Sequence, residues 1–343
     1  MSPASMPGMF MSCTAVCEKL SVRRNQREYG TRAMNDTAVS ENLSAAYMRG
    51  IHRMDDIKIL CVTHREFDDS ILPAGYRVVK VGNRVSDETA LSRGWLCDHP
   101  GENIADENPW YCELTAHYWG WKNLPPSVRY VGLCHYRRYF FEYHKDSKAY
   151  REDILTAERM KQILQKYRVI LSIPTVKLPG KAVLYKNRPD EQQDPHWVIL
   201  RDIIYRDYPE YRGSFDRALA GRYTVWGNLL VTSREIFDEY SAWLFGLLKK
   251  YDAVIADRGE TRKARVDGAL AEHLLLIWME HRFSEHEIFR LEVRNTETDS
   301  FADYSGTAVG KLVHFVRCRR KLLLAARRLR MCVLLVRRRD TNR

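Results

Sequence analysis

The chain has 343 residues, of which 45% are apolar and 29% are charged, a composition typical of a globular protein. Its length allows one large α/β domain with appendages or two fused lobes. No apolar run approaches 18 residues and there is no lipobox or clean signal peptide, so the sequence predicts no membrane span. The eight cysteines include no CxxC pair, which favours a reduced cytosolic protein over a disulfide scaffold or a zinc site.

The net charge of +11 suggests nucleic-acid binding until the charges are located. Residues 311–343 hold 12 Lys and Arg and one acidic residue, Asp340. The preceding 310 residues therefore hold 43 basic and 43 acidic residues. Because the body is neutral and the excess lies in one tail, we do not expect a nucleic-acid partner.

The basic tail has the pattern of an amphipathic helix. Large apolar residues recur at helical spacing between arginines, at Leu312, Phe315, Val316, Leu322, Leu323, Ala326, Leu329, Val333 and Val336. A helix of this kind lies on an anionic bilayer with its apolar stripe in the interface, and each basic residue contributes about 1 kcal/mol. Residues 311–339 are thus predicted to bind a membrane surface. A coiled partner helix or an RNA-binding arm are the alternatives.

The body alternates between strand and helix patterns. The predicted strands, in chain order, cover residues 57–64, 76–83, 130–134, 168–176, 223–233 and 286–293. The predicted helices cover residues 111–124, 154–167, 196–221 with a break at Pro209, 234–255 and 262–282. Asn108 and Pro109 are a plausible cap and first turn for the first helix. This order predicts an α/β fold with a mixed or parallel sheet.

Three segments follow from these patterns. Residues 1–55 show no sustained period and are predicted to be a disordered extension. The α/β domain covers residues 56–300, and residues 301–343 form the basic tail.

Familiar catalytic motifs are absent from the sequence. There is no Gly-rich phosphate loop, no GxSxG, no HExxH and no Cys/His pair at metal spacing. The polar residues at strand ends are therefore the main candidates for a functional site, above all His135, Arg137 and Arg138 in YVGLCHYRRYFF. Guanidinium and imidazole groups at a strand end can hold a diphosphate. Alternatively, the arginines pair with the acidic loop 102–107.

Two carboxylates in the segment ARVDGALAEHLL are candidates for a general base. Glu272 lies among leucines of the predicted helix, and Asp267 is its rival. A capping or ion-paired role is as common for such residues. The polar pair Thr63 and His64 ends the first strand, where open α/β sheets bind ligands.

Two neighbouring motifs carry a family resemblance. The segment GENIADENPWYCELTAHYWGWKN, followed by YVGLCHYRRYF, resembles the family described as domain of unknown function 4422, whose members are bacterial capsular and exopolysaccharide biosynthesis proteins regarded as glycosyltransferases. The resemblance covers roughly residues 57–295 and includes VTHREFD, YPEY, GNLLVTSREIFDEYSAWLF and ARVDGALAEHLL. The extension and the basic tail lie outside it.

The resemblance implies a GT-A-like, Rossmann-related mixed sheet flanked by helices. It also implies transfer of a hexose, which is galactofuranose in some relatives, from a UDP-sugar to a growing surface glycan. Many GT-A enzymes carry an Asp-x-Asp motif for a divalent ion where this chain has Cys134, His135, Tyr136 and Arg137. We therefore expect His135, Arg137 and Arg138 to bind the diphosphate directly without a required cofactor, with Mn²⁺ or Mg²⁺ as the alternative.

The resemblance also assigns further roles. Glu272 matches an acidic position in the family and is the expected base of an inverting displacement, whereas Asp267 departs from an expected apolar residue and leaves the choice between them open. The remaining expected residues line the nucleotide, donor or acceptor sites: Thr63, His64, Asn103, Asn108, Glu113, Asn228 and Arg265.

Lipid-linked oligosaccharides on the inner leaflet are the expected acceptors, so the basic tail implies a cytoplasmic enzyme associated peripherally with the inner face of the plasma membrane. A non-catalytic nucleotide-sugar or carbohydrate-binding protein of the same fold is the alternative function.

Overall fold

The computed structural model describes residues 56–176, 194–220, 223–225 and 227–319. All of them belong to one compact unit, Arg53–Arg343. The predicted extension 1–55 lies outside the described residues, as does the part of the predicted tail from residue 320 onward.

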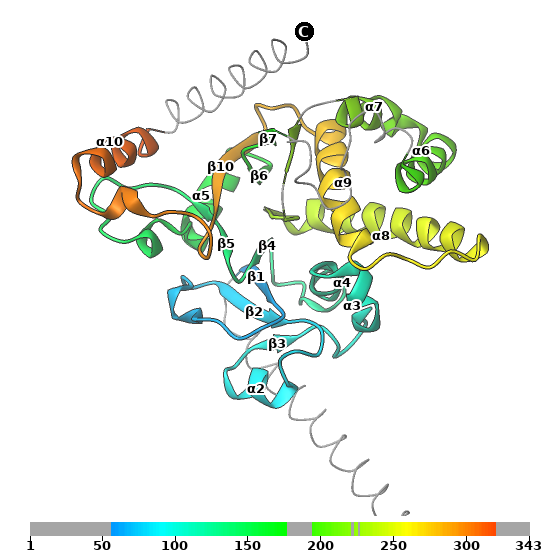
Figure 1. The fold of residues 1–343 in the computed structure, drawn as a ribbon, viewed down its shortest axis with the longest axis horizontal. Coiled ribbons are helices and arrows are strands. Elements are labelled where there is room, and N and C mark those ends of the chain that lie inside the picture. The colour runs from blue at the N-terminus through cyan, green and yellow to red at the C-terminus, as the bar shows by residue number, and fades with distance from the viewer. Residues whose placement is uncertain (1–55, 177–193, 221–222, 226, 320–343) are drawn as a thin grey trace, which may run out of the picture. The chain divides into compact units, whose positions relative to one another are not determined.

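Strands and helices alternate along the chain (Figure 1). The strands are β1 (Ile57–Thr63), β2 (Tyr76–Lys80), β3 (Leu96–Cys97), β4 (Tyr130–His135), β5 (Arg138–Phe141), β6 (Val169–Ser172), β7 (Thr175–Val176), β8 (Tyr223–Thr224), β9 (Leu230–Ser233) and β10 (Ile288–Asn295). The α-helices are α2 (Asp87–Ser92), α3 (Asn108–Tyr111), α4 (Leu114–Asn123), α5 (Ala157–Leu164), α6 (Pro195–Asp207), α7 (Arg212–Ala220), α8 (Arg234–Asp257), α9 (Val266–Arg282) and α10 (Ala308–Arg317).

The main sheet has eight strands and is mixed. Strands β3, β2, β1 and β4 are parallel neighbours. Strand β9 runs antiparallel between β4 and β6, and β10 lies parallel to β6. Strand β5 turns back from β4 at His135 and Arg138 and pairs antiparallel with β10. The predicted α/β fold with a mixed sheet is confirmed.

This topology brings six strand ends to one edge of the sheet. Since β9 is antiparallel to both of its neighbours, β1, β2, β3, β4, β6 and β10 all end at the same edge. The chain leaves β1 toward β2 on one side, and β4 flanks β1 on the other, so a topological switch point lies between β1 and β4. Ligands of open α/β sheets bind at the carboxyl edge beside such a point.

Helices cover both faces of the sheet. Alternate β1 residues Ile57, Ile59 and Cys61 join the core cluster that includes Met160 of α5. On the opposite face, Leu60 of β1 packs against Gly120 of α4, where an added Cβ would lie 2.5 Å from the leucine methyl. Figure 1 shows α6 to α9 on one side of the strands and α5 with α10 on the other. Successive side chains of a strand point to opposite faces of the sheet, so the helices bury strand side chains on both faces.

Several elements differ from the predictions. The predicted helix 111–124 is interrupted at Cys112, whose φ of 53° divides it into α3 and α4. The predicted strand 223–233 is two strands, β8 and β9, separated by a turn at Gly227 and Asn228. Helix α2 and strands β3 and β5 were not predicted, because they are short or lie within polar segments.

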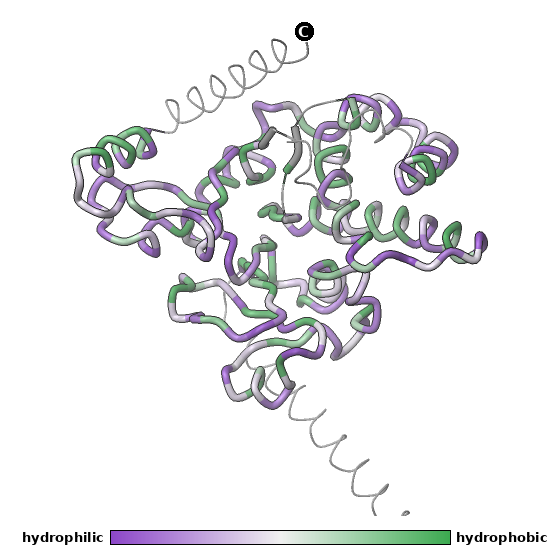
Figure 2. The backbone as a smooth tube through the Cα atoms, in the orientation of Figure 1, coloured by the Kyte–Doolittle hydropathy of each residue, from purple (hydrophilic) through white to green (hydrophobic). Residues whose placement is uncertain are grey.

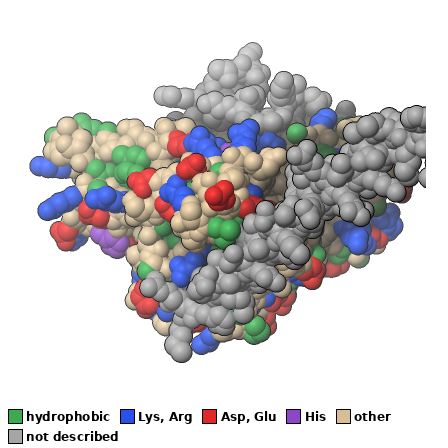
Figure 3. Space-filling view, turned by 90° about the horizontal axis from the view of Figure 1, so that it is seen from below, with side chains coloured by type: hydrophobic (Ala, Val, Ile, Leu, Met, Phe, Trp, Pro, Cys, Tyr) green, Lys and Arg blue, Asp and Glu red, His purple; other side chains and the backbone are tan. Residues whose placement is uncertain are grey.

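Basic and acidic side chains alternate over the described part of the face seen in Figure 3, in keeping with the neutral composition of the body. The helices of the described residues include none that is long and apolar enough to cross a membrane.

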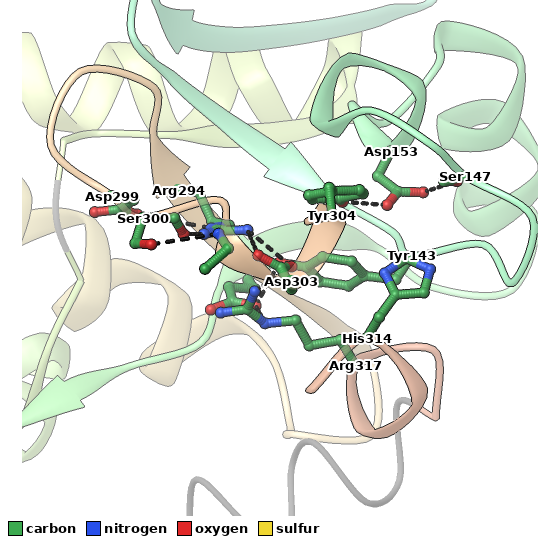
Figure 4. A network of polar contacts seen from close by, with 12 residues as sticks. Tyr143, Ser147, Asp153, Arg294, Asp299, Ser300, Asp303, Tyr304, His314 and Arg317 are labelled. Carbon is green, nitrogen blue, oxygen red and sulfur yellow. Dashed lines mark hydrogen bonds and ion pairs between the residues drawn. The ribbon is translucent and has the colours of Figure 1, made fainter. Parts of the chain in front are cut away.

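The chain after β10 is fastened to the core by a polar network (Figure 4). The Asp303 carboxylate accepts hydrogen bonds from Arg294 of β10 and Arg317 of α10. The Tyr304 hydroxyl bonds to Asp153, and an imidazole nitrogen of His314 lies 2.7 Å from the His144 carbonyl oxygen. Because Asp303 and Arg294 are buried, these contacts hold the start of the predicted tail against the sheet domain.

Helix α10 carries an apolar stripe on its exposed side. Val309, Leu312, Val313 and Phe315 are the large hydrophobic side chains exposed among the described residues, with exposed fractions of 36 to 72%. Figure 2 shows hydrophobic and hydrophilic residues alternating along this helix. The other stripe residues, from Leu322 to Val336, lie outside the described part of the chain.

Candidate functional site

The charges of several arginines act on His64 at the carboxyl end of β1. Burial is the largest cause that lowers the pKa of His64, and the charges of Arg84, Arg65, Arg137 and Arg265 lower it further. These arginines come from four separate segments: the loops after β1 and β2, the turn after β4 and the start of α9. Four positive charges that act on one neutral imidazole form an environment that attracts an anion.

One carboxylate bridges two of these arginines. Glu297, in the turn after β10, pairs with Arg65 through one oxygen and with Arg137 through the other, at 2.7 Å in the second case. Both guanidiniums also lie over the ring of Tyr136, 4.9 and 5.3 Å from its centroid. In the described structure Arg137 therefore pairs with Glu297, and the alternative prediction that it pairs with the acidic loop 102–107 is wrong.

Arginine 137 retains an unused donor. Its Nε is buried and has no hydrogen-bond partner among the described residues. Sequence reasoning missed Arg65, Arg84 and Glu297, although Arg65 directly follows the Thr63–His64 pair and Arg84 follows the second predicted strand. The positions of these residues after strand ends were the signal that could have found them.

A second group of polar side chains adjoins the arginines. The Arg138 guanidinium lies 3.3 Å from Nδ1 of His135, and Nε2 of His135 lies 3.8 Å from the Glu113 carboxylate. Asn228 donates from its amide to Glu113 at 2.8 Å and to the Gly268 carbonyl at 3.0 Å. The structure thus brings together His135, Arg138, Glu113 and Asn228, which come from distant parts of the sequence.

Burial is the main cause that lowers the pKa of His135, while the Glu113 carboxylate opposes the shift and Arg138 adds to it. The imidazole is therefore neutral near pH 7, and one ring nitrogen can donate a hydrogen bond while the other accepts one.

Glu272 of α9 lies beside this group and has an unusual acidity. The backbone N–H of Gly227 donates to its carboxylate at 2.6 Å. Burial and, second, the charge of Glu113 raise the pKa of Glu272 to about 8, against the opposing effects of Arg138 and Arg265. The side chain is only partly exposed. A carboxylate with a pKa near the working pH is suited to general base catalysis.

Arg265 connects the two groups. Its charge acts on both His64 and Glu272, and the side chain is exposed. The residue precedes α9 with a φ of 65°, and its N–H donates to the Pro109 carbonyl at 2.9 Å. The arginine cluster and the carboxylates therefore form one continuous candidate site.

Unusual backbone conformations gather at this site. Among the described residues, the non-glycine residues with positive φ are Cys112, Asn228 and Arg265. Cys112 precedes Glu113, Asn228 binds Glu113, and Arg265 adjoins α9. Close packing enforces the geometry, since a Cβ at Gly268 would lie 3.2 Å from the Tyr111 carbonyl oxygen. Strained backbone of this kind costs stability and persists mainly at functional sites.

Asp267, the rival candidate base, lies in a different environment. Its side chain is 0% exposed, and neither carboxylate oxygen has a hydrogen-bond partner among the described residues. Arg262 lies 3.8 Å away, yet burial and the charge of Asp252 outweigh it and raise the pKa of Asp267 to about 8. A fully buried carboxyl group does not reach a substrate.

Three other predicted donor-site residues use their polar groups locally. The Thr63 hydroxyl donates to the Arg65 carbonyl at 2.5 Å and fixes the turn after β1. The Asn103 amide donates to the carbonyls of His99 and Gly101 within its own loop. Asn108 donates to the Cys112 carbonyl at 2.9 Å. These contacts position the loops around the site.

A set of possible metal ligands lies at the ends of β2 and β3. Among the described residues, Asp87, Cys97 and His99 bring one ligand atom each to within 4.8 Å of the others. The ammonium of Lys80 lies 2.7 Å from Asp87 and already compensates that carboxylate. Burial raises the pKa of Cys97 to about 12, so its thiol is protonated.

Comparison with known proteins agrees with this architecture. A solved structure described as the apo structure of the bifunctional glycosyltransferase WbbM is similar, with a TM-score of 0.56 and 24% sequence identity over 72% of this chain and 46% of that chain. The two share a fold, and this chain spans less than half of that protein. No curated protein matches the sequence significantly.

The family profile described as "Domain of unknown function (DUF4422)" matches residues 58–283, and the chain belongs to this family. The matched residues include His64 and the four arginines whose charges act on it, and also Glu113, His135, Asn228 and Glu272. Glu297 lies outside the match.

An Asp267→Asn variant tests whether Asp267 is a buried neutral acid. Because the pKa of Asp267 is raised in the folded state, the folded protein holds a proton that the unfolded chain releases, and this contribution to stability is lost as pH rises from about 4 to about 8. Replacement by the neutral amide should remove about 2 kcal/mol of the decline in unfolding free energy between pH 6 and 8. Urea denaturation at both pH values measures this.

Asp257→Asn, on the exposed end of α8, is the matched control and should leave the pH dependence unchanged. An unaltered decline in the Asp267→Asn variant would show that Asp267 is ionised in the folded protein, contrary to its assignment as a buried neutral acid.

Proposed function

We propose that this protein is a glycosyltransferase that moves a hexose from a UDP-sugar to a lipid-linked glycan in capsular or exopolysaccharide synthesis. One observation carries the proposal. The arginines that act on His64 and the partly exposed carboxylate of Glu272, whose pKa is raised, lie at the same edge of the sheet. The first part suits a diphosphate and the second suits a base that deprotonates a hydroxyl group.

The donor diphosphate binds between β1 and β4 in this proposal. Arg137, Arg138 and His135 provide the donors expected from the sequence, and Arg65, Arg84 and Arg265 add positive charge from neighbouring loops. Glu297 occupies Arg65 and Arg137 in the free protein, and the diphosphate displaces it because it carries more negative charge.

Glu272 removes the proton from the acceptor hydroxyl. The oxygen then attacks the anomeric carbon, a new C–O bond forms, and the bond from that carbon to the diphosphate oxygen breaks. The electron pair leaves with UDP, whose developing charge the arginines stabilise. The Gly227 N–H holds one oxygen of Glu272 and orients the carboxylate. This arrangement supports an inverting reaction.

The architecture supports a GT-A-like assignment in which the parallel strands β3, β2, β1 and β4 form the nucleotide half. The groups near the expected diphosphate position are mainly cationic, which favours direct binding without a metal. Glu113 and Glu272 are each already engaged by an N–H donor. Mn²⁺ or Mg²⁺ remains the alternative.

The acceptor reaches the site at the membrane surface in this proposal. The exposed stripe of α10 begins a segment with 12 basic residues between positions 311 and 343, and the polar network of Figure 4 fastens that helix to the sheet domain. An apolar stripe with basic neighbours suits an anionic bilayer, which would place the enzyme on the inner face of the plasma membrane.

Turnover tests the proposal directly. UDP release from a panel of UDP-hexoses, including UDP-galactofuranose, should occur with one donor in the presence of a lipid-linked acceptor extract. Glu272→Gln should lower kcat by at least about a hundredfold without weakening UDP binding, because it removes only the base. Asp257→Asn serves as the surface control.

The pH profile separates a base from a structural residue. Since the base must be ionised, kcat/KM should rise with pH through about 8. Glu113→Gln removes a charge that raises the pKa of Glu272, so the rise of kcat/KM should occur at lower pH in this variant. Full activity of Glu272→Gln would contradict the assignment, and UDP binding without turnover of any donor would favour a nucleotide-sugar-binding protein.

Membrane association is tested by vesicle flotation of the full chain. The protein should float with vesicles that contain phosphatidylglycerol and remain unbound with phosphatidylcholine alone, and 1 M salt should release it. A triple Val309→Ser, Leu312→Ser, Phe315→Ser variant should bind at least about tenfold more weakly, because it removes the exposed apolar stripe. Equal flotation of this variant would show that the stripe does not enter the bilayer.

A further inference from the structure

A cavity of about 270 Å³ lies at the base of α10. Its walls come from β10, from α5, from the residues around the end of β5 and from the last residues of α10. The residues that matter for its chemistry are Phe141, Glu142, Tyr143, Arg159, Glu292 and Arg317. None of them belongs to the candidate donor site, so the cavity is a separate feature.

The charged groups of the cavity are paired. Arg159 binds Glu142 in a two-pronged contact, with Nε 2.6 Å from one oxygen and Nη2 2.9 Å from the other. Arg317 lies 3.6 Å from Glu292, which also accepts a hydrogen bond from the Tyr143 hydroxyl at 2.8 Å. Arg290, the third arginine of the lining, pairs with Glu285 at 2.6 Å. Because each of the three arginines has an acidic partner, the lining does not present the excess of positive charge that a phosphate would require.

Paired charges suit a neutral ligand rich in hydroxyl groups. Guanidinium N–H groups and carboxylate oxygens lie side by side, and a sugar hydroxyl both donates and accepts. Three N–H groups of Arg159 donate to Glu142 and Gln162, out of the five that a guanidinium carries. Hydrogen bonds to such charged groups are stronger than those between neutral groups.

Apolar groups complete the lining. Tyr143 provides aromatic surface, and Ile173 and Leu291 provide aliphatic surface, while Phe141 beneath them is buried in the core. The C–H face of a pyranose ring packs well on such surfaces, while its hydroxyls meet the polar groups. The volume lies slightly below the range of about 300–1,000 Å³ for sites of drug-sized ligands, so it suits a single sugar unit.

The cavity also has a suitable position relative to the candidate site. Strand β5 begins at Arg138, which lies beside His135, and ends at Phe141 in the cavity. Three residues of strand span about 10 Å. The cavity therefore lies one short strand from the proposed diphosphate site and next to the helix proposed to meet the membrane.

We propose that this cavity is a glycan subsite that holds a hexose unit of the acceptor, away from the reacting hydroxyl. The inference rests on the proposed transferase function for the identity of the glycan. It adds a binding site whose role is to select the acceptor by a sugar that does not react.

Saturation-transfer NMR on the full chain tests the subsite without turnover. The probes are the methyl α- and β-pyranosides of glucose, galactose and mannose, each measured with and without saturating UDP. At least one glycoside should receive saturation from the protein, and UDP should not displace it, because the donor site and the cavity are separate.

Arg159→Ala should weaken glycoside binding by about tenfold or more. Arg201→Ala is the matched control, since Arg201 has a similar exposed fraction (41% against 42%) and also pairs with a carboxylate, but lies on α6. Glu142→Gln is a second variant, which should weaken the same glycoside while UDP binding confirms that the protein is folded.

The outcomes separate the two proposals. No glycoside binding by a protein that binds UDP would overturn the subsite, as would displacement by UDP or unchanged binding in Arg159→Ala. Glycoside binding that depends on Arg159, in a protein that does not bind UDP, would overturn the proposed transferase function and support the glycan site.

Discussion

Guanidinium groups that converge at one edge of a sheet repel one another unless a negative charge lies among them. In this protein that charge comes from Glu297, which holds Arg65 and Arg137 over the ring of Tyr136. The mixed sheet makes the meeting possible, because β1, β4 and β10 all end at the same edge. The organisation of the candidate site depends on this balance of charge.

The carboxylate half of the site depends on backbone geometry. The turn at Gly227 and Asn228 presents an N–H to Glu272 and an amide to Glu113, and both residues have positive φ. Glu113 in turn raises the pKa of Glu272. A short, strained turn therefore sets both the orientation and the acidity of the proposed base, at a cost that the packed helices α4, α8 and α9 can support.

Local patterns predicted much of the fold. Apolar runs located β1, β2, β4, β6 and β10, and helical periodicity located α5 to α9, because buried faces impose these periods on the sequence. The polar residues at the ends of β1 and β4 were also visible. The helical pattern also made Glu272 a candidate base, and the resemblance to the DUF4422 family added Glu113 and Asn228, which no local pattern would have joined to it.

The remainder depended on tertiary structure. Glu297 is separated from Arg137 by 160 residues, and only the pairing of β5 with β10 brings them together. Short elements such as β3 lack the length to show a period. Asn103 and Asn108 were predicted to meet the donor, yet their amides bind nearby carbonyls, as this residue type commonly does in loops. Sequence alone does not decide between a ligand and a neighbouring backbone group.

The central claim is that protein cations, rather than a metal, hold a nucleotide diphosphate between β1 and β4. Calorimetric titration of the protein with UDP and with uridine, both in EDTA, tests it most directly. UDP should bind at least about a hundredfold more tightly than uridine, since several charge-assisted hydrogen bonds depend on the phosphates. Equal affinities in EDTA, with a preference for UDP that appears only when Mn²⁺ or Mg²⁺ is added, would contradict it.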